Sequence, residues 1–544
     1  MSKKKSNLKI LLVVPRYTSS EKPNYVYSFP LGLAYISAVM KEADYDVTCI
    51  NINHLAGSTE NILHKILDNQ KYDVVATGHV GIGYSMIEKI IKSVRNHNSR
   101  PKIILGGVIV TSEPELMFES LRPDFAVIGE GEITIIDLLE CIEKKKDFKK
   151  VEGIIYKNSE GETIKTKLRK PIENIDEIPF PDFDGLEFEK IFQSSCSSLN
   201  YACNYHDYPR VYPIMGSRGC PFRCTFCYHC LGDKYRERSM KNLMDEIEWA
   251  VEKYKINSVF IYDDLFSYRK ERIYEFCGEM KKLSEKVGEK IRWSCQLSVL
   301  HVDKELLKIM KDAGCETISY GFESFSEEVL RSMRKPITPE KIDVAFKATL
   351  EAKIGIQANF IFGDFAETKQ TAIKTLNYWK KNCKGQVNLG FIYAYPGSEL
   401  YNNCLKKGII KDKLSFIKNE MKNEVIINMT DAMNESDFEW LKKEVDKLMR
   451  KVVNISVPLH VKKMSGVRNK NRHEVLAKCP FCKEKTYYKN FYLRTRYIYR
   501  SYTMCRNCNM RYYLVSPLFR VLMKFGLVND LLRKYHAILR RKIV

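Results

Sequence analysis

A chain of 544 residues is too long to fold around one hydrophobic core, so we expect three or four domains. The composition, 44% hydrophobic and 29% charged, is typical of a globular protein. No apolar run reaches the roughly 18 residues that a membrane-spanning helix needs, which excludes a protein anchored by such a helix.

The formal charge of +22 is concentrated near the C-terminus. From residue 451 onward, 22 lysines and arginines face three acidic residues, which gives +19 there and near balance in the first 450 residues. Seventeen cysteines, an odd number, argue against a disulfide framework, and seven of them form two tight groups that indicate metal sites. The apolar run Ile10–Val14 stops after five residues at Pro15, so we interpret it as a strand, not a signal peptide, and expect a cytoplasmic protein.

Residues 1–150 alternate between strand and helix signals. The predicted strands are 10–14, 46–52, 73–77, 102–105 and 125–128, and the predicted helices are 31–41, 62–67, 86–95 and 133–143. Buried strands joined by crossover helices predict a doubly wound, Rossmann-like α/β domain, which binds ligands at the carboxyl ends of its strands.

A second α/β series follows a linker. Residues 151–205 combine a predicted hairpin with the proline pair Pro179 and Pro181, which favours a domain boundary. Residues 206–400 then predict six strands, too few for a closed eight-fold barrel but sufficient for a partial (β/α)6 barrel. These strands are 213–216, 258–262, 291–296, 317–321, 356–362 and 387–394. Residues 401–470 form a mixed helical extension, and residues 471–544 a separate basic unit.

The first cysteine group lies directly after the first barrel strand. Cys220, Cys224 and Cys227 have the spacing C-x3-C-x2-C, and thiolates are the preferred ligands of iron–sulfur clusters. Three ligands leave one iron of a 4Fe–4S cluster without a protein group. A structural zinc site is the alternative, with His229 or Cys230 as the fourth ligand.

This segment resembles the radical S-adenosylmethionine superfamily, which places an aromatic residue, here Phe226, before the third cysteine. The resemblance covers residues 10 to about 410. It implies that S-adenosylmethionine binds the open iron. Reductive cleavage there yields a 5′-deoxyadenosyl radical, with electrons from a donor such as flavodoxin or ferredoxin.

The same resemblance implies further S-adenosylmethionine contacts. They are Asp263 and Asp264 after the second strand, Glu323 and Ser324 near the ribose, Arg334 (followed by Lys335) as a cation, and Gly363 on the adenine-contacting strand. A capping aspartate and a solvated helix charge are the plain alternatives. The sequence departs from the family at Asp364–Ala366, although Glu367 still matches, and the segment Tyr395–Tyr401 is a structural landmark.

The N-terminal domain resembles the cobalamin-binding domain fused to this branch of the superfamily. The resemblance rests on Phe29–Tyr35, Leu105–Thr111 and Ile128–Ile133. The implied cofactor contacts are Gly78, Gly106, Gly107, Thr111, Gly129, Glu130 and Gly131. The Asp-x-His-x-x-Gly signature that places a histidine on cobalt is missing. A vestigial domain that only shapes the substrate cavity is therefore the alternative.

The second cysteine group is a pair of C-x2-C knuckles. Cys479, Cys482, Cys505 and Cys508 flank a β-rich segment, which predicts a zinc ribbon, with a second iron–sulfur cluster as the alternative. The ribbon is basic and aromatic, with Lys483, Lys485, Lys489, Arg494, Arg496, Arg500 and Arg511 among its tyrosines. This surface and the basic tail 518–544 suit RNA, another anionic polymer or an anionic membrane surface. A tail docked on its own protein is the plain alternative.

The leading functional hypothesis is cobalamin-dependent methyl transfer to an unactivated carbon of an unknown substrate, since most relatives of this architecture are methyltransferases. The basic C-terminus favours an anionic substrate. Radical cyclisation or rearrangement without methyl transfer is the second hypothesis. An RNA-associated protein that uses the ribbon is the third. Peripheral association with a membrane is the alternative to a purely cytoplasmic location.

Overall fold

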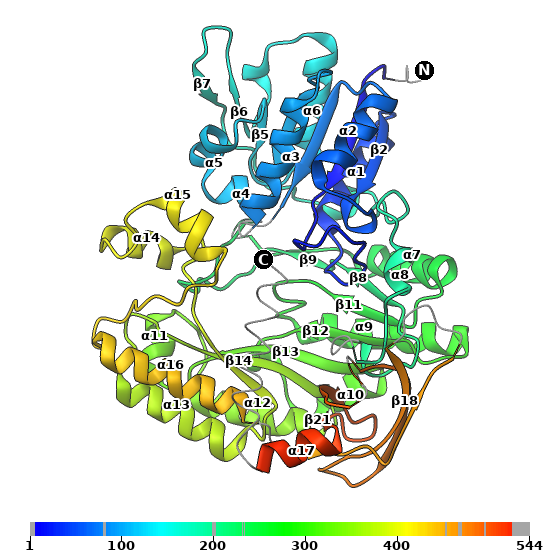
Figure 1. The fold of residues 1–544 in the computed structure, drawn as a ribbon, viewed down its shortest axis with the longest axis vertical. Helices are drawn as coiled ribbons and strands as arrows, with labels where there is room; N and C mark the ends of the chain where they lie inside the picture. The colour runs from blue at the N-terminus through cyan, green and yellow to red at the C-terminus, as the bar shows by residue number, and fades with distance from the viewer. Residues whose placement is uncertain are drawn as a thin grey trace.

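The computed structural model describes residues 6–79, 83–198, 203–230, 232, 234–451, 454–465, 471–493, 495 and 497–524. Figure 1 shows the N-terminal α/β domain at one end, a partial barrel beside it and the helix α17 (Pro517–Lys524) of the C-terminal unit at the other end. None of the described helices combines the length and apolarity that crossing a bilayer requires.

The N-terminal domain is a seven-stranded sheet in the order β2-β1-β3-β4-β5-β6-β7. Its strands are β1 (Lys9–Val14), β2 (Asp46–Asn51), β3 (Val74–Gly78), β4 (Lys102–Gly106), β5 (Phe125–Val127), β6 (Ile154–Lys157) and β7 (Thr163–Lys165). β1 to β5 pair in parallel, which confirms the doubly wound sheet. The strand order reverses between β1 and β3, and ligands bind at the carboxyl ends of strands beside such a point.

Both faces of this sheet are covered. The helices are α1 (Leu31–Glu42), α2 (Thr59–Asn69), α3 (Tyr84–Asn96), α4 (Val108–Ser112), α5 (Pro114–Leu121) and α6 (Glu132–Lys144). Successive residues of β1 alternate between faces: Ile10 and Leu12 join the core that includes α1 and α6, whereas Leu11 joins the core that includes α2 and α3.

The hairpin that we predicted in the linker lies in the N-terminal sheet. β6 pairs antiparallel with β5, and β7 pairs with β6. The N-terminal sheet therefore continues past residue 150, the boundary expected from sequence.

The partial barrel is a six-stranded parallel sheet in the order β15-β14-β13-β12-β11-β8. Its strands are β8 (Val211–Ile214), β11 (Ser258–Ile261), β12 (Arg292–Gln296), β13 (Cys315–Glu323), β14 (Gly355–Phe362) and β15 (Val387–Phe391). Its helices are α8 (Met240–Tyr254), α9 (Lys270–Val287), α10 (Lys304–Asp312), α11 (Glu327–Ser332), α12 (Pro339–Glu351) and α13 (Lys369–Asn382). β8 and β15 stay at opposite edges, which confirms an open barrel.

The segment after β15 connects the barrel to the N-terminal domain. It contains α14 (Glu399–Lys406), α15 (Lys413–Ser415) and a π-helix, Phe416–Met421. Leu400 and Phe416 belong to the same apolar core as α2 and α3, and Lys413 pairs with Glu113 at 2.9 Å. α16 (Glu435–Arg450) then packs against α13 and β15.

The C-terminal unit consists of two small sheets, not the single hairpin expected from sequence. One contains β16 (Ile455–Ser456), β21 (Arg511–Val515) and β20 (Arg500–Met504). The other contains β17 (His460–Lys463), β18 (Arg472–Lys478) and β19 (Lys485–Tyr492). One cysteine pair lies between β18 and β19 and the other between β20 and β21, so a metal ion bound by all four cysteines would join the two sheets.

Candidate active site

The cluster loop, residues 219–235, connects β9 (Ser217–Arg218) to β10 (Arg236–Glu237). The two short strands pair antiparallel and close the neck of the loop. Gly219 adopts a φ of 78° at this neck, and a Cβ there would lie 2.6 Å from the carbonyl oxygen of Lys234. Glycine is required because the backbone is left-handed and the two arms of the loop approach closely.

The landmark segment 395–401 braces the cluster loop from outside. The backbone N–H of Leu400 donates to the carbonyl of Thr225 at 2.8 Å. A Cβ on Gly397 would lie 2.4 Å from the Tyr228 ring, so this ring rests on the glycine backbone. The segment thus contributes contacts to the loop, not a reactive group.

A cavity of about 250 Å³ opens beside the loop, and Cys220, Cys224 and Cys227 all line it. Among the described residues only the C-terminal cysteines bring three or more metal-binding atoms within 4.8 Å of one another, so at least one pair of these thiols is farther apart. A single zinc ion with sulfur bonds of about 2.3 Å would need every pair near 3.8 Å. The donor set and its wider spacing fit a multi-iron cluster better than zinc.

The cavity environment opposes thiolate formation unless positive charge is supplied. Burial raises the pKa of Cys220 and Cys224, and burial together with Cys224 raises the pKa of Cys227 to about 12. Iron, once bound, supplies the positive charge that keeps such thiols ionised. Lys335 adds a cation to the same wall.

Lys335 forms an ion pair inside the cavity. Its Nζ lies 3.0 Å from Glu323 Oε1 and 6.0 Å from the centre of the Phe226 ring. Burial disfavours the charged amine, but Glu323 and Cys224 outweigh it and raise the pKa of Lys335 above its usual value. Asp264 lines the same cavity, and burial raises the pKa of its carboxyl group. These groups suit a ligand that carries an amine, a carboxylate and hydroxyls.

Of the predicted S-adenosylmethionine contacts, Phe226, Asp264 and Glu323 lie on this cavity wall. Asp263 lies outside it: the side chain is buried, and its Oδ1 accepts the Gly216 N–H at 2.7 Å. This bond connects the ends of β8 and β11, and burial raises the pKa of Asp263 to about 7.

Three further predicted residues also lie outside the cavity wall. Ser324 accepts the N–H of Ser326 at 3.2 Å in the turn after β13. Gly363 has a φ of 103° and packs near Phe438. Arg334 is exposed and forms two hydrogen bonds of 2.7 Å to Glu399. A ligand contact by any of these residues stays a prediction.

Lys335, the second residue of the Arg-Lys pair, places a cation on the cavity wall, whereas Arg334 pairs with Glu399. Arg334 adopts a left-handed φ of 49° at the end of α11, which turns successive side chains in different directions. Sequence alone identifies the Arg-Lys pair but contains no signal for this backbone reversal.

A second cavity, of about 450 Å³, lies at the carboxyl ends of the N-terminal strands. All seven residues predicted to contact cobalamin line it: Gly78, Gly106, Gly107, Thr111, Gly129, Glu130 and Gly131. Gly107 has a φ of 87°, and a Cβ there would lie 2.9 Å from the His79 carbonyl oxygen. Thr111 Oγ1 accepts the Gly129 N–H at 3.0 Å and holds two of these loops together. A glycine-lined crevice at this edge fits a bulky ligand such as cobalamin.

The barrel contributes the remaining wall of the second cavity. Met215, Arg218 and Cys230 line it: Cys230 belongs to the cluster loop, Arg218 to β9, and Met215 to the turn between β8 and β9. Cys230 therefore faces the N-terminal cavity, whereas the three predicted cluster ligands face the other one. The same loop separates the two cavities.

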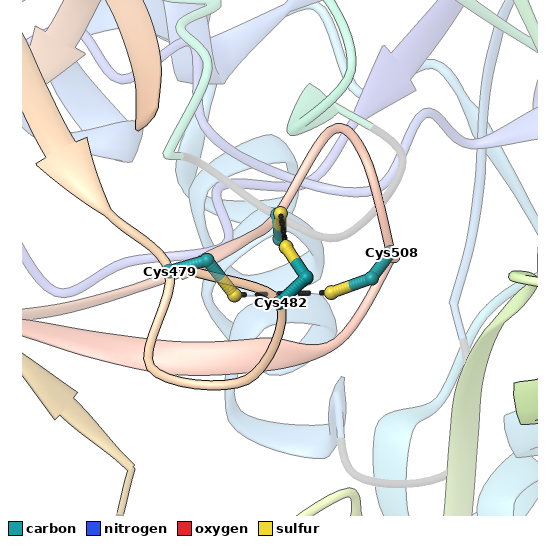
Figure 2. A group of neighbouring side chains, drawn as sticks. Cys479, Cys482 and Cys508 are labelled. Atoms are coloured by element: carbon teal, nitrogen blue, oxygen red, sulfur yellow. Dashed lines mark hydrogen bonds between the residues drawn. The ribbon is translucent and has the colours of Figure 1, made fainter. Parts of the chain in front are cut away.

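The four C-terminal cysteines converge on one point, as Figure 2 shows for the labelled Cys479, Cys482 and Cys508. The sulfur–sulfur distances are 3.8 Å for Cys479–Cys508 and 3.6 Å for Cys482–Cys505. A tetrahedron with zinc–sulfur bonds of about 2.3 Å has edges of about 3.8 Å. The predicted four-cysteine site is present, and its geometry fits zinc better than a second iron–sulfur cluster.

The ribbon is docked on the amino ends of the barrel strands. Asn509, which follows the last cysteine, donates to Glu316 at the start of β13 at 2.6 Å. Arg511 and Gln386, just before β15, exchange two hydrogen bonds of 2.7 and 2.9 Å. The cluster loop follows the carboxyl end of β8, so the ribbon lies at the opposite end of the barrel (Figure 1). β14 alone, eight residues long, spans about 26 Å between these ends.

This placement changes the interpretation of the basic surface. The guanidinium group of Arg511 donates to the carbonyl of Gly385 at 3.1 Å, and Arg506 pairs with Asp207 at 2.8 Å. Arg494, Arg496 and the tail 525–544 lie outside the described residues. The described part of the ribbon is therefore docked on the barrel. The alternative of a tail docked on its own protein falls mostly on residues 525–544, outside the described residues, and stays a prediction.

Two family models match the chain. The model described as the radical SAM superfamily matches residues 214–378, and the B12 binding domain model matches residues 25–139. The first range contains the cluster loop and the 250 Å³ cavity, and the second contains most of the glycine-lined cavity.

Two relatives match about three quarters of the chain. The chain is 29% identical over 413 residues to an uncharacterised methyltransferase of Pyrococcus horikoshii, covering 74% of this chain and 84% of that protein. It is 25% identical over 429 residues to the anaerobic magnesium-protoporphyrin IX monomethyl ester cyclase of Rubrivivax gelatinosus, covering 77% and 74%.

The radical S-adenosylmethionine methyltransferase TsrM of Kitasatospora setae, solved with cobalamin and a [4Fe-4S] cluster, superposes with a TM-score of 0.61 at 14% identity. The match covers 73% of this chain and 78% of TsrM, so the fold is shared. The radical SAM match covers the cavity beside the cluster loop, and the B12-binding match covers most of the glycine-lined cavity. The chain belongs to the radical S-adenosylmethionine superfamily and carries a B12-binding domain at its N-terminal side.

Proposed function

We propose that this chain is a cobalamin-dependent radical S-adenosylmethionine methyltransferase that acts on an unactivated carbon. The observation that carries the proposal is the cluster loop, which borders both cavities. Cys220, Cys224 and Cys227 line one of them, while Cys230 of the same loop and Arg218 directly before it line the other. Groups bound in the two cavities would lie on opposite sides of a single loop, close enough to serve one substrate.

The residues that would hold each cofactor follow from the cavity walls. The three cysteines would hold a 4Fe–4S cluster, and the glycine-lined loops of the N-terminal domain would hold cobalamin. When bound, the cluster with S-adenosylmethionine supplies a hydrogen-abstracting radical, and cobalamin supplies a transferable methyl group.

The protein's own groups orient and shield these ligands. Lys335 and Glu323, paired at 3.0 Å, offer a cation and an acceptor for the amino acid and ribose parts of S-adenosylmethionine. Phe226 lines the same cavity and presents an apolar ring. Because the ion pair is largely buried, the ligand binds where water is excluded and electrostatic contacts are strong.

Anaerobic reconstitution with iron, sulfide and hydroxocobalamin tests the proposal. Product analysis after reduction and addition of S-adenosylmethionine should find both S-adenosylhomocysteine and 5′-deoxyadenosine, because methyl transfer uses two molecules of S-adenosylmethionine. Cys220→Ala should abolish formation of 5′-deoxyadenosine. Cys141→Ala removes a buried thiol outside both cavities and serves as the matched control. Retained cleavage in Cys220→Ala would refute the cluster assignment.

Radical cyclisation or rearrangement without methyl transfer is the second candidate. The similarity to the magnesium-protoporphyrin ester cyclase favours it. The two candidates differ in one product: 5′-deoxyadenosine without S-adenosylhomocysteine would support rearrangement and contradict methyl transfer.

We further propose, as a separate function, that the ribbon contacts an anionic polymer, RNA first of all. β19 exposes Lys485, Tyr487 and Lys489 in alternation on one face, a pattern that offers phosphate contacts and stacking. The full-length chain should bind RNA with an affinity that falls steeply as salt rises. Binding to anionic vesicles in place of RNA would favour a membrane surface, and binding to neither would remove this function.

The proposed location is the cytoplasm, with a flavodoxin or ferredoxin as electron donor.

A further inference from the structure

The neck of the cluster loop brings two positive charges face to face. Arg218 in β9 and Arg236 in β10 are direct cross-strand partners in the antiparallel pair. Both side chains are about 95% buried. Like charges directly opposite each other destabilise a strand pair, and burial increases the penalty. The neck therefore needs anionic partners to close.

Those partners come from the N-terminal domain. Glu130 Oε1 accepts from Arg218 at 3.1 Å, and Glu130 Oε2 accepts from Arg236 at 2.9 Å. Glu132 accepts from Arg218 at 2.6 Å. The side chains of both glutamates are at least 91% buried, so among the described residues these two carboxylates face the two guanidinium groups away from water.

Glu130 occupies a central position in this network, because its carboxylate contacts both arms of the loop, whereas Glu132 contacts only one. Glu130 Oε2 also accepts the backbone N–H of Ile172, and Arg236 donates to the carbonyl of the same residue at 2.5 Å. One carboxylate thus joins the loop between β5 and α6, the linker and both ends of the cluster loop.

We propose that Glu130 is a positioning residue that closes the neck of the cluster loop and fixes it against the B12-binding domain. The sequence predicted Glu130 as a cobalamin contact, but its carboxylate oxygens already accept three hydrogen bonds from protein groups. Order in the iron-binding loop then depends on docking of the other cofactor's domain. This inference goes beyond the proposed reaction, since it holds whether or not a methyl group is transferred.

Hydrogen–deuterium exchange of the full-length chain, prepared without iron or cobalamin, tests this role separately from any activity. Glu130→Gln should accelerate amide exchange in peptides that cover residues 211–219 and 234–239 at least about tenfold, because both arginines lose their shared anion. Glu132→Gln should accelerate exchange mainly in the first peptide. Glu113→Gln, which breaks another contact between the same domains at Lys413, should leave both peptides unchanged.

Spectroscopy of the reconstituted protein adds a second readout. Glu130→Gln should also perturb the absorption and electron paramagnetic resonance of the cluster, although Glu130 lies in the other domain. Wild-type exchange at the neck combined with weaker hydroxocobalamin binding would overturn the proposal and favour a direct cofactor contact. If Glu130→Gln does not fold, Glu130→Asp retains the charge but withdraws it by one methylene. Exchange equal to wild type in that variant would equally overturn the proposal.

Discussion

Replacement of Gly219 by alanine tests whether the neck geometry maintains the iron-binding loop. A left-handed backbone costs a non-glycine residue about 1–2 kcal/mol. The new Cβ would lie 2.6 Å from the carbonyl oxygen of Lys234 and 3.1 Å from that of Gly232, both backbone atoms that cannot rotate away. Forcing an extra carbon into such a site costs about 1–3 kcal/mol. Together these terms disfavour the closed neck by about 2–5 kcal/mol, a factor of about thirty or more.

The assay is iron and sulfide content per chain after anaerobic reconstitution, together with denaturant unfolding. Gly219→Ala should lose most of its cluster. Gly288→Ala is the matched control, because Gly288 at the end of α9 has a φ of 73° but no atom within 4 Å of a Cβ. Gly288→Ala should lower stability only by the cost of the left-handed backbone, about 1–2 kcal/mol, and the variant should keep its iron. Wild-type iron content in Gly219→Ala would refute the reasoning.

Three further predictions address the cavity cation, the ribbon metal and a buried carboxyl group. Lys335→Met should weaken S-adenosylmethionine binding and destabilise the fold by about 3–5 kcal/mol, because Glu323 is left buried and unpaired. Arg334→Met removes an exposed ion pair and should lower the free energy of unfolding by no more than about 1 kcal/mol. If Arg334→Met and Lys335→Met weaken S-adenosylmethionine binding and lower stability equally, Lys335 is not the cation that binds the ligand. Chelation of zinc, or Cys508→Ser, should lower the melting temperature by several degrees but leave iron content unchanged; concurrent iron loss would argue against separate metal sites. Burial raises the pKa of Glu367 from 4.5 to about 8. The unfolded chain releases this proton at a lower pH than the folded protein does. The free energy of unfolding should therefore fall as pH rises from about 4.5 to about 8 and stay constant above about pH 8. Glu367→Gln should remove that part of the decline, each pKa unit being worth about 1.4 kcal/mol, and an unchanged slope in urea unfolding would exclude the group.

Much of the fold could be predicted because its signals are local. Apolar runs such as Ile10–Val14 are buried on both faces of a parallel sheet, and that burial is visible in the sequence itself. The hairpin β6–β7 was identified as a hairpin, but its pairing with β5 depends on a contact between distant segments. Period and turn signals contain no information on which sheet edge such a hairpin joins.

The residues of the candidate site likewise fall into those that the sequence identifies and those that depend on distant contacts. Glycines at strand ends, such as Gly107, could be identified because a close backbone approach restricts the residue type. The role of Glu130 could not, because its arginine partners lie 88 and 106 residues further along the chain. The choice between Arg334 and Lys335 depended on one left-handed residue, for which arginine gives no signal.

The docked ribbon has a consequence for how a substrate reaches the reactive centre. Its described part contacts the amino ends of β13 and β15 through Asn509 and Arg511, at the end of the barrel opposite the cluster loop. A substrate that approaches from the cluster side passes the rim where α14 meets the N-terminal domain and the cluster loop. The size and shape of an acceptable substrate are then set by these rim elements. Exchange of the segment 392–429 between relatives is therefore a more direct route to altered substrate choice than any change in the ribbon.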